Sequence, residues 1–285
     1  MVARERFELS SAGPKPAMLD WVKDKADFIQ YLQSKRYNPL YFKSILSNLS
    51  KHVTALSEPM DIIAISSTLS SGQQHNLNRA LSALFSFYEL KGYPTEQLNR
   101  LRKAMPKDDI GVDIKIPSEQ QILSSLGRLN SIPLRYKALY NLLLDSGLRL
   151  TEAVKALNNQ SEPTKVNGFY RVTLGYFRAS KLAYAAYFTE ATYSLICSNK
   201  EPIKECGARR YLSKYKFVTP KYLRKFAFDK MIELNIPESV ADFIQGRTPK
   251  SIGAKHYMAI VRQADNFYGK YAGYLSSLRG ASNAV

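Results

Sequence analysis

The sequence predicts a mainly α-helical protein with a small β-hairpin, divided into a helical N-terminal domain and a second domain of α+β structure. Apolar residues recur at helical intervals through the first hundred positions and again from Glu190 onward. A segment with two prolines, a glycine and clustered charges interrupts that pattern at 106–117. Between this segment and Glu190, β-branched and aromatic residues at 168–189 surround the turn sequence RASK, which is typical of a hairpin.

The interruption sets the predicted domain boundaries. Residues 1–105 form the first domain, 106–117 an interdomain linker with an extended middle, and 118–285 the second domain. A chain of 285 residues is long enough to give each domain its own core. Its 45% hydrophobic content favours folded protein over disorder.

Four helices are predicted in the first domain from the spacing of their apolar residues. They cover residues 18–36, 38–56, 71–92 and 95–105. Asn38 is a typical N-cap, and Pro39 follows it at the first helical position. Because none of the four needs a strand as a partner, this domain is predicted to be wholly helical.

The second domain is predicted to begin with a helix capped by Ser118. One or two helices follow within 133–157, and then comes the hairpin at 168–189. Helices resume at Glu190 and continue, with breaks at prolines and glycines, towards the C-terminus.

The charge of the chain indicates a polyanionic partner. The formal net charge is +17, and from Ile203 to the end there are 15 Lys and Arg against 6 Asp and Glu. So large a surplus costs self-repulsion unless phosphates neutralise it, which favours double-stranded nucleic acid over a merely soluble basic surface. A membrane is disfavoured, because no long uncharged apolar run exists and no helix sets its basic residues opposite a broad apolar face. The N-terminus has no apolar signal sequence, so a cytoplasmic protein is expected.

The metal-binding residue types are scattered. Cys197 and Cys206 cannot supply a four-ligand site, and no histidine pairs with Cys, Asp or Glu at a metal-ligand spacing. No metal, cofactor or small-molecule substrate is therefore predicted. The two cysteines are expected to be buried or half-exposed thiols, because disulfides are unusual inside the cell.

Two cations stand at positions that suit phosphate binding. Arg149, in the sequence SGLRLTE, lies where one helix ends and another begins, and helix N-termini favour anions. Glu152, three residues on, can hold its guanidinium on the same side of the helix. Lys181 projects from the predicted hairpin turn. Taken alone, Arg149 and Glu152 are equally consistent with a surface salt bridge. Lys181, taken alone, is equally consistent with a solvated turn.

The C-terminal third adds a second set of candidates. Thr219 caps a helix that Pro220 opens, and this places Lys221 and Arg224 on one face of its first turns. Arg247 follows the helix that Gly246 stops, and Tyr257 comes after a glycine-containing loop. The alternatives are a solvated basic helix face for the cations and an ordinary packing role for the tyrosine.

Taken in order, these segments resemble the tyrosine recombinase (lambda-integrase) family, and more closely its archaeal fusellovirus-type integrases. The family pattern is an arginine in G-L-R-x-[ST]-E, a lysine on a β-turn, an H/K-x-x-R pair, a G-H/W/R step, and a tyrosine about ten residues later. Here the motifs are SGLRLTE, RASK, KYLR, QGR and KHYMA. They supply Arg149, Lys181, Lys221, Arg224, Arg247 and Tyr257. The resemblance covers residues 118 to about 273.

The resemblance implies a core-binding domain followed by a catalytic domain, and it implies roles for the six residues. Tyr257 would attack a DNA phosphate to form a 3′-phosphotyrosine, and Arg149, Arg224 and Arg247 would stabilise the transition state. Lys181 would protonate the leaving 5′ oxygen. Lys221 could take the tyrosine's proton if the arginines depress its pKa, although two departures from the family pattern, at Lys221 and Arg247, leave the base open. Neither a metal nor ATP is required.

The resemblance also implies a site-specific recombinase that integrates a viral or plasmid genome and works as a homo-tetramer on two DNA sites. Additional DNA contacts are expected from lysines and an arginine other than the six candidate catalytic residues: Lys35, Arg36, Lys43, Lys51, Lys250 and Lys255. The segment 266–285 is expected to dock on a neighbouring protomer. Two alternatives remain, a type IB-like topoisomerase and a non-catalytic DNA-binding protein. Target sequence and cis or trans cleavage stay open.

Overall fold

The structure is a computed structural model, and it describes residues 18–283 except 109–110, 112, 160, 179–180 and 248–258. At 176–178, 181–182 and 283 it describes the backbone alone. The chain divides into two compact units, Met1–Val112 and Asp113–Val285. The division falls within the segment 106–117.

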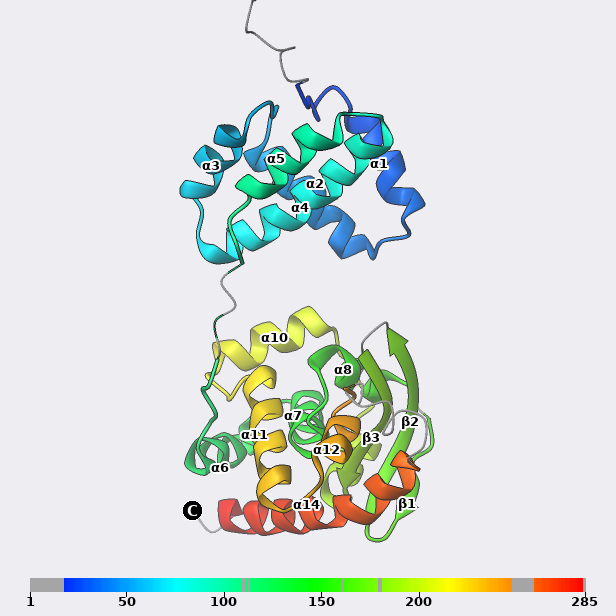
Figure 1. The fold of residues 1–285 in the computed structure, drawn as a ribbon. Coiled ribbons are helices and arrows are strands. Elements are labelled where there is room, and N and C mark those ends of the chain that lie inside the picture. Colours follow the sequence, from blue (N-terminus) through cyan, green and yellow to red (C-terminus); the bar gives the residue numbers. More distant parts are fainter. Residues whose placement is uncertain are drawn as a thin grey trace, which may run out of the picture. The chain divides into compact units, whose positions relative to one another are not determined.

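Helices make up the described part of the first unit (Figure 1): α1 (Lys25–Ser34), α2 (Pro39–His52), α3 (Pro59–Ser67), α4 (Ser71–Leu90) and α5 (Thr95–Ala104). The longest of them, α4, supplies Phe85 and Tyr88 to a core that also contains Trp21. The predicted cap of α2 is confirmed, since the side chain of Asn38 accepts a hydrogen bond from the backbone N–H of Leu40 at 2.9 Å.

Three expectations for this unit are wrong. Residues 18–24 precede α1 and residues 53–56 follow α2 instead of extending these helices, because Leu19 forms a β-bridge with Leu56 through N–O contacts of 2.8 and 3.0 Å. Helix α3 is missing from the prediction, because its run of four apolar residues is too short to show a helical period. Its start is fixed locally by the carboxylate of Asp61, which accepts the backbone N–H of Glu58 at 2.9 Å.

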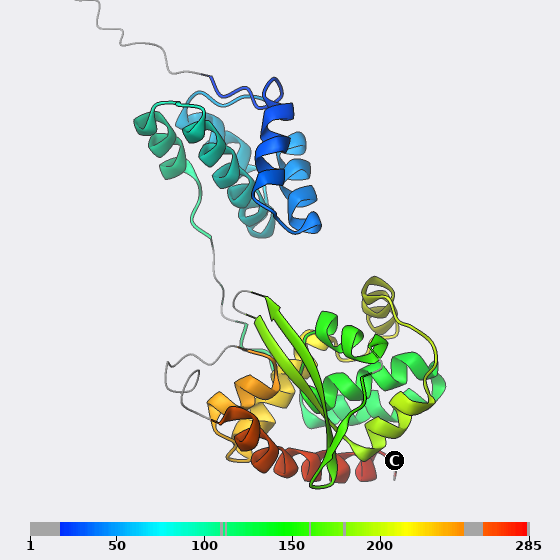
Figure 2. The same ribbon diagram turned by 90° about the vertical axis from the view of Figure 1, so that its right-hand side faces the viewer.

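The second unit contains α6 (Glu119–Gly127), η1 (Arg128–Ser131), α7 (Leu134–Ser146), α8 (Leu150–Asn158), β1 (Thr164–Val166), β2 (Phe169–Arg178), β3 (Lys181–Thr189), α9 (Glu190–Ser198), α10 (Glu205–Lys214), α11 (Pro220–Glu233), α12 (Glu238–Ile244) and α14 (Ile260–Asn283). Its strands form one antiparallel sheet in the order β1–β2–β3 (Figure 2). The predicted hairpin is confirmed, with pairs running from Phe169 and Thr189 to Arg178 and Lys181. The short strand β1 was not expected.

Two further findings concern the described ranges as a whole. None of their helices is long and apolar enough to cross a membrane. Cys197 and Cys206 are both exposed free thiols, so the expectation that they are buried or half-exposed is wrong.

Helix α7 is enclosed by the rest of the second unit. Every residue from Ala138 to Ser146 is buried, and the helix contacts α9, α11 and β3. Surrounding elements therefore fix the position of its C-terminal end, where Gly147 leads into α8.

A buried carboxylate at the end of α7 connects three elements. Asp145 accepts hydrogen bonds from the backbone N–H and the hydroxyl of Thr189, both at 2.8 Å, and from the hydroxyl of Thr192 at 2.6 Å. Arg279 of α14 forms an ion pair with the same carboxylate. Asp145 is fully buried, so its charge depends on these partners for solvation.

Helix α14 packs on its own unit. The hydroxyls of the fully buried Tyr268 and Tyr271 donate to the backbone carbonyls of Asp145 and Leu144 at 3.0 and 2.9 Å. Figure 1 shows α14 running along the base of the unit, next to α6. The expectation that 266–285 docks on a neighbouring protomer stays a prediction.

Arg279→Ala is expected to lower the free energy of unfolding by about 3 kcal/mol, because it leaves the carboxylate of Asp145 buried without its cation. Urea unfolding followed by circular dichroism measures the loss. Lys270→Ala is the matched control, since Lys270 is an exposed cation on the same helix. Equal losses in the two variants would contradict a special role for the Asp145–Arg279 pair.

Candidate active site

The turn between α7 and α8 places Arg149 at the start of α8. Gly147 ends α7 with φ +59°, and Arg149 occupies the N-cap position of the next helix. The guanidinium of Arg149 contacts the carboxylate of Glu152 at 3.0 Å, as the spacing predicts. The same nitrogen donates to the backbone carbonyl of Gly246 at 2.8 Å, which ties α8 to the end of α12.

A second glycine shapes the facing turn. Gly246 has φ +69°, and a Cβ atom there would lie 2.9 Å from the Cβ of Ala183 in β3. Only glycine tolerates both this backbone conformation and this approach of the strand. The two turns therefore bring their carbonyl groups together between α8, α11 and α12.

Arg224 of α11 lies between these two turns. One terminal nitrogen donates to the carbonyls of Gly147 and Gln245 at 2.7 and 2.5 Å. The other is buried and has no hydrogen-bond partner within the part of the chain that the structure describes. Burial, and after it the charges of Arg149 and Arg247, lower the pKa of Arg224 to about 9, so it stays positively charged at neutral pH.

A pocket of about 520 Å³ opens over this arginine. Its lining consists of Arg149, Leu150, Arg209, Thr219, Pro220, Lys221, Arg224, Lys225 and Arg247. Among these described residues six are cationic and none is acidic. We call this the cationic pocket. Its composition suits an anion with several oxygens, such as a phosphate.

The side chain of Arg247 is held in place by two residues that do not line the cationic pocket. Its guanidinium contacts the buried carboxylate of Asp242 at 3.0 Å and lies 4.5 Å from the ring centre of Phe228. An arginine held by a carboxylate and an aromatic ring loses little side-chain entropy when it binds a ligand.

Lys221 lies at the exposed edge of the same pocket, with 65% of its side chain accessible. Its ammonium group contacts the carboxylate of Asp113 at 2.5 Å, and this contact raises the pKa of Lys221. Lys221 could act as the base only if the neighbouring arginines depressed its pKa. That condition is not met here, because the nearest charge is the carboxylate of Asp113.

Several predicted residues fall outside what the structure describes. Tyr257, Lys250 and Lys255 belong to 248–258 and are not among the described residues. Lys181 is described in its backbone alone, at the first position of β3. The structure therefore brings together Arg149, Lys221, Arg224 and Arg247. In the first unit, all four proposed DNA contacts are exposed: Lys35, Arg36, Lys43 and Lys51.

Sequence reasoning missed three residues at this site. Arg209 reaches the cationic pocket from α10, where it contacts Glu205 at 2.7 Å, and Lys225 lies one turn beyond Lys221. The fully buried Gln245 donates to the carbonyl of Arg224 at 2.9 Å. The only sequence signal of Arg209 and Lys225 is their basic character, which many surface residues share. Gln245 is the first residue of the QGR motif, but the family pattern gives that position no role.

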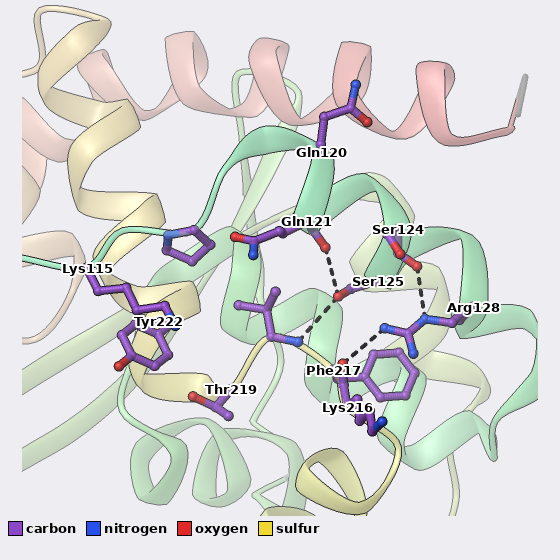
Figure 3. A pocket seen from close by; sticks show the side chains of 12 residues that line it. Lys115, Gln120, Gln121, Ser124, Ser125, Arg128, Lys216, Phe217, Thr219 and Tyr222 are labelled. Carbon is purple, nitrogen blue, oxygen red and sulfur yellow. Dashed lines mark hydrogen bonds between the residues drawn. The ribbon is translucent and has the colours of Figure 1, made fainter.

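A second pocket, of about 420 Å³, is lined by residues of α6, the start of α11 and the loop before it (Figure 3). Its arginine serves the fold: Arg128 donates to the backbone carbonyls of Tyr215 and Lys216 at 3.0 and 3.1 Å. The lining also contains Lys115, which lies beside Tyr222 in the figure. This pocket has fewer cations than the cationic pocket and is the weaker candidate for phosphate.

A family model described as archaeal phage integrase matches residues 114–274, more than half of the chain. The chain belongs to this family. It is a tyrosine recombinase, and the matched range contains all six predicted catalytic positions. No curated protein sequence matches the chain significantly.

Solved structures of lambda integrase share the fold of this integrase. A lambda integrase(75–356) dimer bound to a COC′ core site matches with a TM-score of 0.60 at 14% identity, over 79% of this chain and 93% of that chain. A lambda integrase tetramer bound to a Holliday junction matches with a TM-score of 0.62 at 13% identity, over 83% and 80%. The predicted fold class, mainly helical with a small sheet, is thereby confirmed.

Gly147→Ala is expected to lower the free energy of unfolding by about 3 kcal/mol, from a left-handed backbone and a steric clash. The new Cβ would lie 2.4 Å from Nε2 of the buried Gln245. Gly175→Ala is the matched control, because Gly175 has φ +61° but open space around it. Guanidinium unfolding should show a loss of only about 1 kcal/mol for the control. Equal losses would argue against a tight contact at Gly147.

Proposed function

We propose that this integrase cleaves and rejoins DNA at specific sites through a 3′-phosphotyrosine on Tyr257, and that it integrates a viral or plasmid genome into host DNA. The observation that carries the proposal is the buried, unpartnered nitrogen of Arg224 beneath the cationic pocket, as seen in the described part of the chain. A desolvated donor without an acceptor is costly, and a phosphate oxygen would satisfy it.

The electrostatics of the site favour a phosphodiester. The mutual repulsion of Arg149, Arg224 and Arg247 contributes to the lowered pKa of Arg224, and an anion between them relieves that repulsion. During attack, charge accumulates on the non-bridging oxygens of phosphorus. Preorganised arginines stabilise this charge without reorganising, because their carbonyl and carboxylate partners already hold them.

The reaction then proceeds in two balanced steps. The phenol oxygen of Tyr257 forms a bond to phosphorus and gives its proton to solvent water, while the bond from phosphorus to the 5′ oxygen breaks. Lys181 gives a proton to that oxygen as it leaves. In the second step a 5′ hydroxyl attacks the phosphotyrosine and returns its proton to Lys181. The bond from phosphorus to the tyrosine oxygen breaks, that oxygen takes a proton from solvent water, and the DNA strand is rejoined. The phosphotyrosine bond conserves the energy of the cleaved DNA phosphodiester bond. Rejoining therefore needs no external energy source.

Lys221 acts in this scheme as a cation and not as the base. Its contact with Asp113 raises its pKa, so it holds its proton at neutral pH. A protonated lysine donates hydrogen bonds to a phosphate oxygen and adds positive charge to the mouth of the cationic pocket.

The likeness to lambda integrase supports assembly on DNA. The matched lambda integrase structures are a dimer on a core site and a tetramer on a Holliday junction. We propose that this protein likewise forms a homo-tetramer on two double-stranded DNA sites in the cytoplasm of its host. The exposed residues Lys35, Arg36, Lys43 and Lys51 would contact the DNA backbone through the helical unit, which serves as a core-binding domain.

A pool of nicked duplexes with a randomised centre tests the proposal whatever the target sequence is. The nick lets the short cleaved strand diffuse away, so the covalent protein–DNA adduct accumulates and is seen on a denaturing gel. We expect an adduct at Tyr257 that survives EDTA and is absent from Tyr257→Phe, with duplex binding retained. An adduct in that variant would disprove the assignment. Sequencing the captured DNA gives the site, and strand exchange between two such sites distinguishes a recombinase from a topoisomerase.

Arg224→Lys is expected to slow adduct formation about 10²- to 10³-fold, because an ammonium group cannot bond both carbonyls and also present a second N–H₂ group to the phosphate. Single-turnover kinetics on the captured duplex measure the rate. Arg135→Lys, at a surface arginine paired with Glu201, is the control and should leave the rate within twofold. A comparable rate in Arg224→Lys would show that charge alone suffices at this position.

A further inference from the structure

The first residue of the second unit contacts two lysines of the cationic pocket. The carboxylate of Asp113 lies 2.5 Å from the ammonium group of Lys221 and 3.1 Å from that of Lys225. Both lysines belong to the first turns of α11, which also carries Arg224. None of the sequence motifs includes Asp113, and it is 108 residues away from Lys221.

Backbone contacts fix Asp113 in this place. The ammonium group of Lys225 also donates to the backbone carbonyls of Asp113 and Lys115, the latter at 3.1 Å. The ammonium group of Lys115 lies 5.6 Å from the ring centre of Tyr222, and Figure 3 shows these two side chains next to each other. The segment 113–115, which begins the second unit, is therefore attached to the start of α11.

Asp113 contacts the lysines but does not belong to the lining of the cationic pocket. Lys221 and Lys225 line the cationic pocket, whereas Asp113 is not among its lining residues. A phosphate can therefore enter without displacing the carboxylate. The two lysines lower the pKa of Asp113 to about 2, so it is ionised at neutral pH.

We propose that Asp113 is a positioning residue for strand cleavage, which holds the ammonium group of Lys221 at the mouth of the cationic pocket for contact with the DNA phosphate. The inference rests on the proposed function and deepens it, because it assigns the entry segment of the catalytic unit a part in the site. Without the carboxylate, the long and mostly exposed side chain of Lys221 would be repelled by Arg149, Arg224 and Lys225. Fixing it in advance reduces the entropy that is lost when the phosphate binds.

A double-mutant cycle tests whether Asp113 acts through Lys221. Adduct formation on the captured duplex is compared for the wild type, Asp113→Asn, Lys221→Gln and the double variant. We expect Asp113→Asn to slow the reaction about fivefold, the value of a well-oriented exposed ion pair, with duplex affinity unchanged or tighter. The double variant should be no slower than Lys221→Gln alone. Asp113→Glu, which keeps the carboxylate, should recover most of the rate.

Glu233→Gln is the matched control, because Glu233 is an exposed carboxylate paired with Lys230 at 2.6 Å on the same helix. It changes the net charge equally and should leave the rate within twofold. Three outcomes would overturn the proposal: faster cleavage in Asp113→Asn, as expected of a competitor for phosphate; an unchanged rate; or a double variant whose losses multiply.

A chemical readout on the DNA-free protein separates this inference from the proposed function. Lys221 is labelled with an N-hydroxysuccinimide ester, and its extent of reaction is measured by peptide mass spectrometry with Lys270 as the internal reference. We expect labelling about threefold faster or more in Asp113→Asn, because the carboxylate keeps the amine protonated and covered. Equal labelling would overturn the contact itself. Faster labelling with an unchanged cleavage rate would overturn the positioning role alone, and a wild type that forms no adduct would refute the proposed function and with it the role.

Discussion

The guanidinium of Arg224 is held by the carbonyls of Gly147 and Gln245, and the geometry of the cationic pocket depends on this contact. These carbonyls come from the ends of α7 and α12, where left-handed glycines turn the chain. The arginine is consequently buried, and this burial, with the nearby charges of Arg149 and Arg247, lowers its pKa to about 9. Two strong hydrogen bonds offset part of the desolvation and leave one side of the fork for a ligand. The fold thus keeps a charged donor in place at a free-energy cost of desolvation, and a bound anion would offset that cost.

The same helix end is anchored from the opposite side. Asp145 lies two residues before Gly147, and its carboxylate joins α7 to β3, α9 and α14. On either side of residues 248–258 the described chain is therefore fixed: Arg247 is paired with Asp242, and Tyr268 of α14 donates to the carbonyl of Asp145. A disturbance of the Asp145 network would act on the carbonyl of Gly147 and on the frame around the segment that carries Tyr257.

The sequence predicts this site where the information is local. Arg149 with Glu152, and Lys221 with Arg224, are short contiguous patterns, and the structure places all four close to one pocket or in it. Arg209, Gln245 and Asp113 escape prediction because only the tertiary fold brings them to α11, across separations that no periodicity describes. The same reason hides the pair of Asp145 and Arg279. Helix α3 and strand β1 are missed for a different reason, since both are too short for their apolar residues to establish a period.

The cations of the pocket differ in whether a carboxylate neutralises them, and this difference bears on the charge of the ligand that the pocket can bind. Arg149, Arg209 and Arg247 each contact one carboxylate, and Lys221 and Lys225 share a fourth. Among the described residues of the pocket, Arg224 is bound by carbonyls alone. Among the described residues, six positive and four negative charges leave a surplus of two. A phosphodiester carries one negative charge and a phenolate adds a second, so this surplus favours the approach of an ionised tyrosine to the bound phosphate.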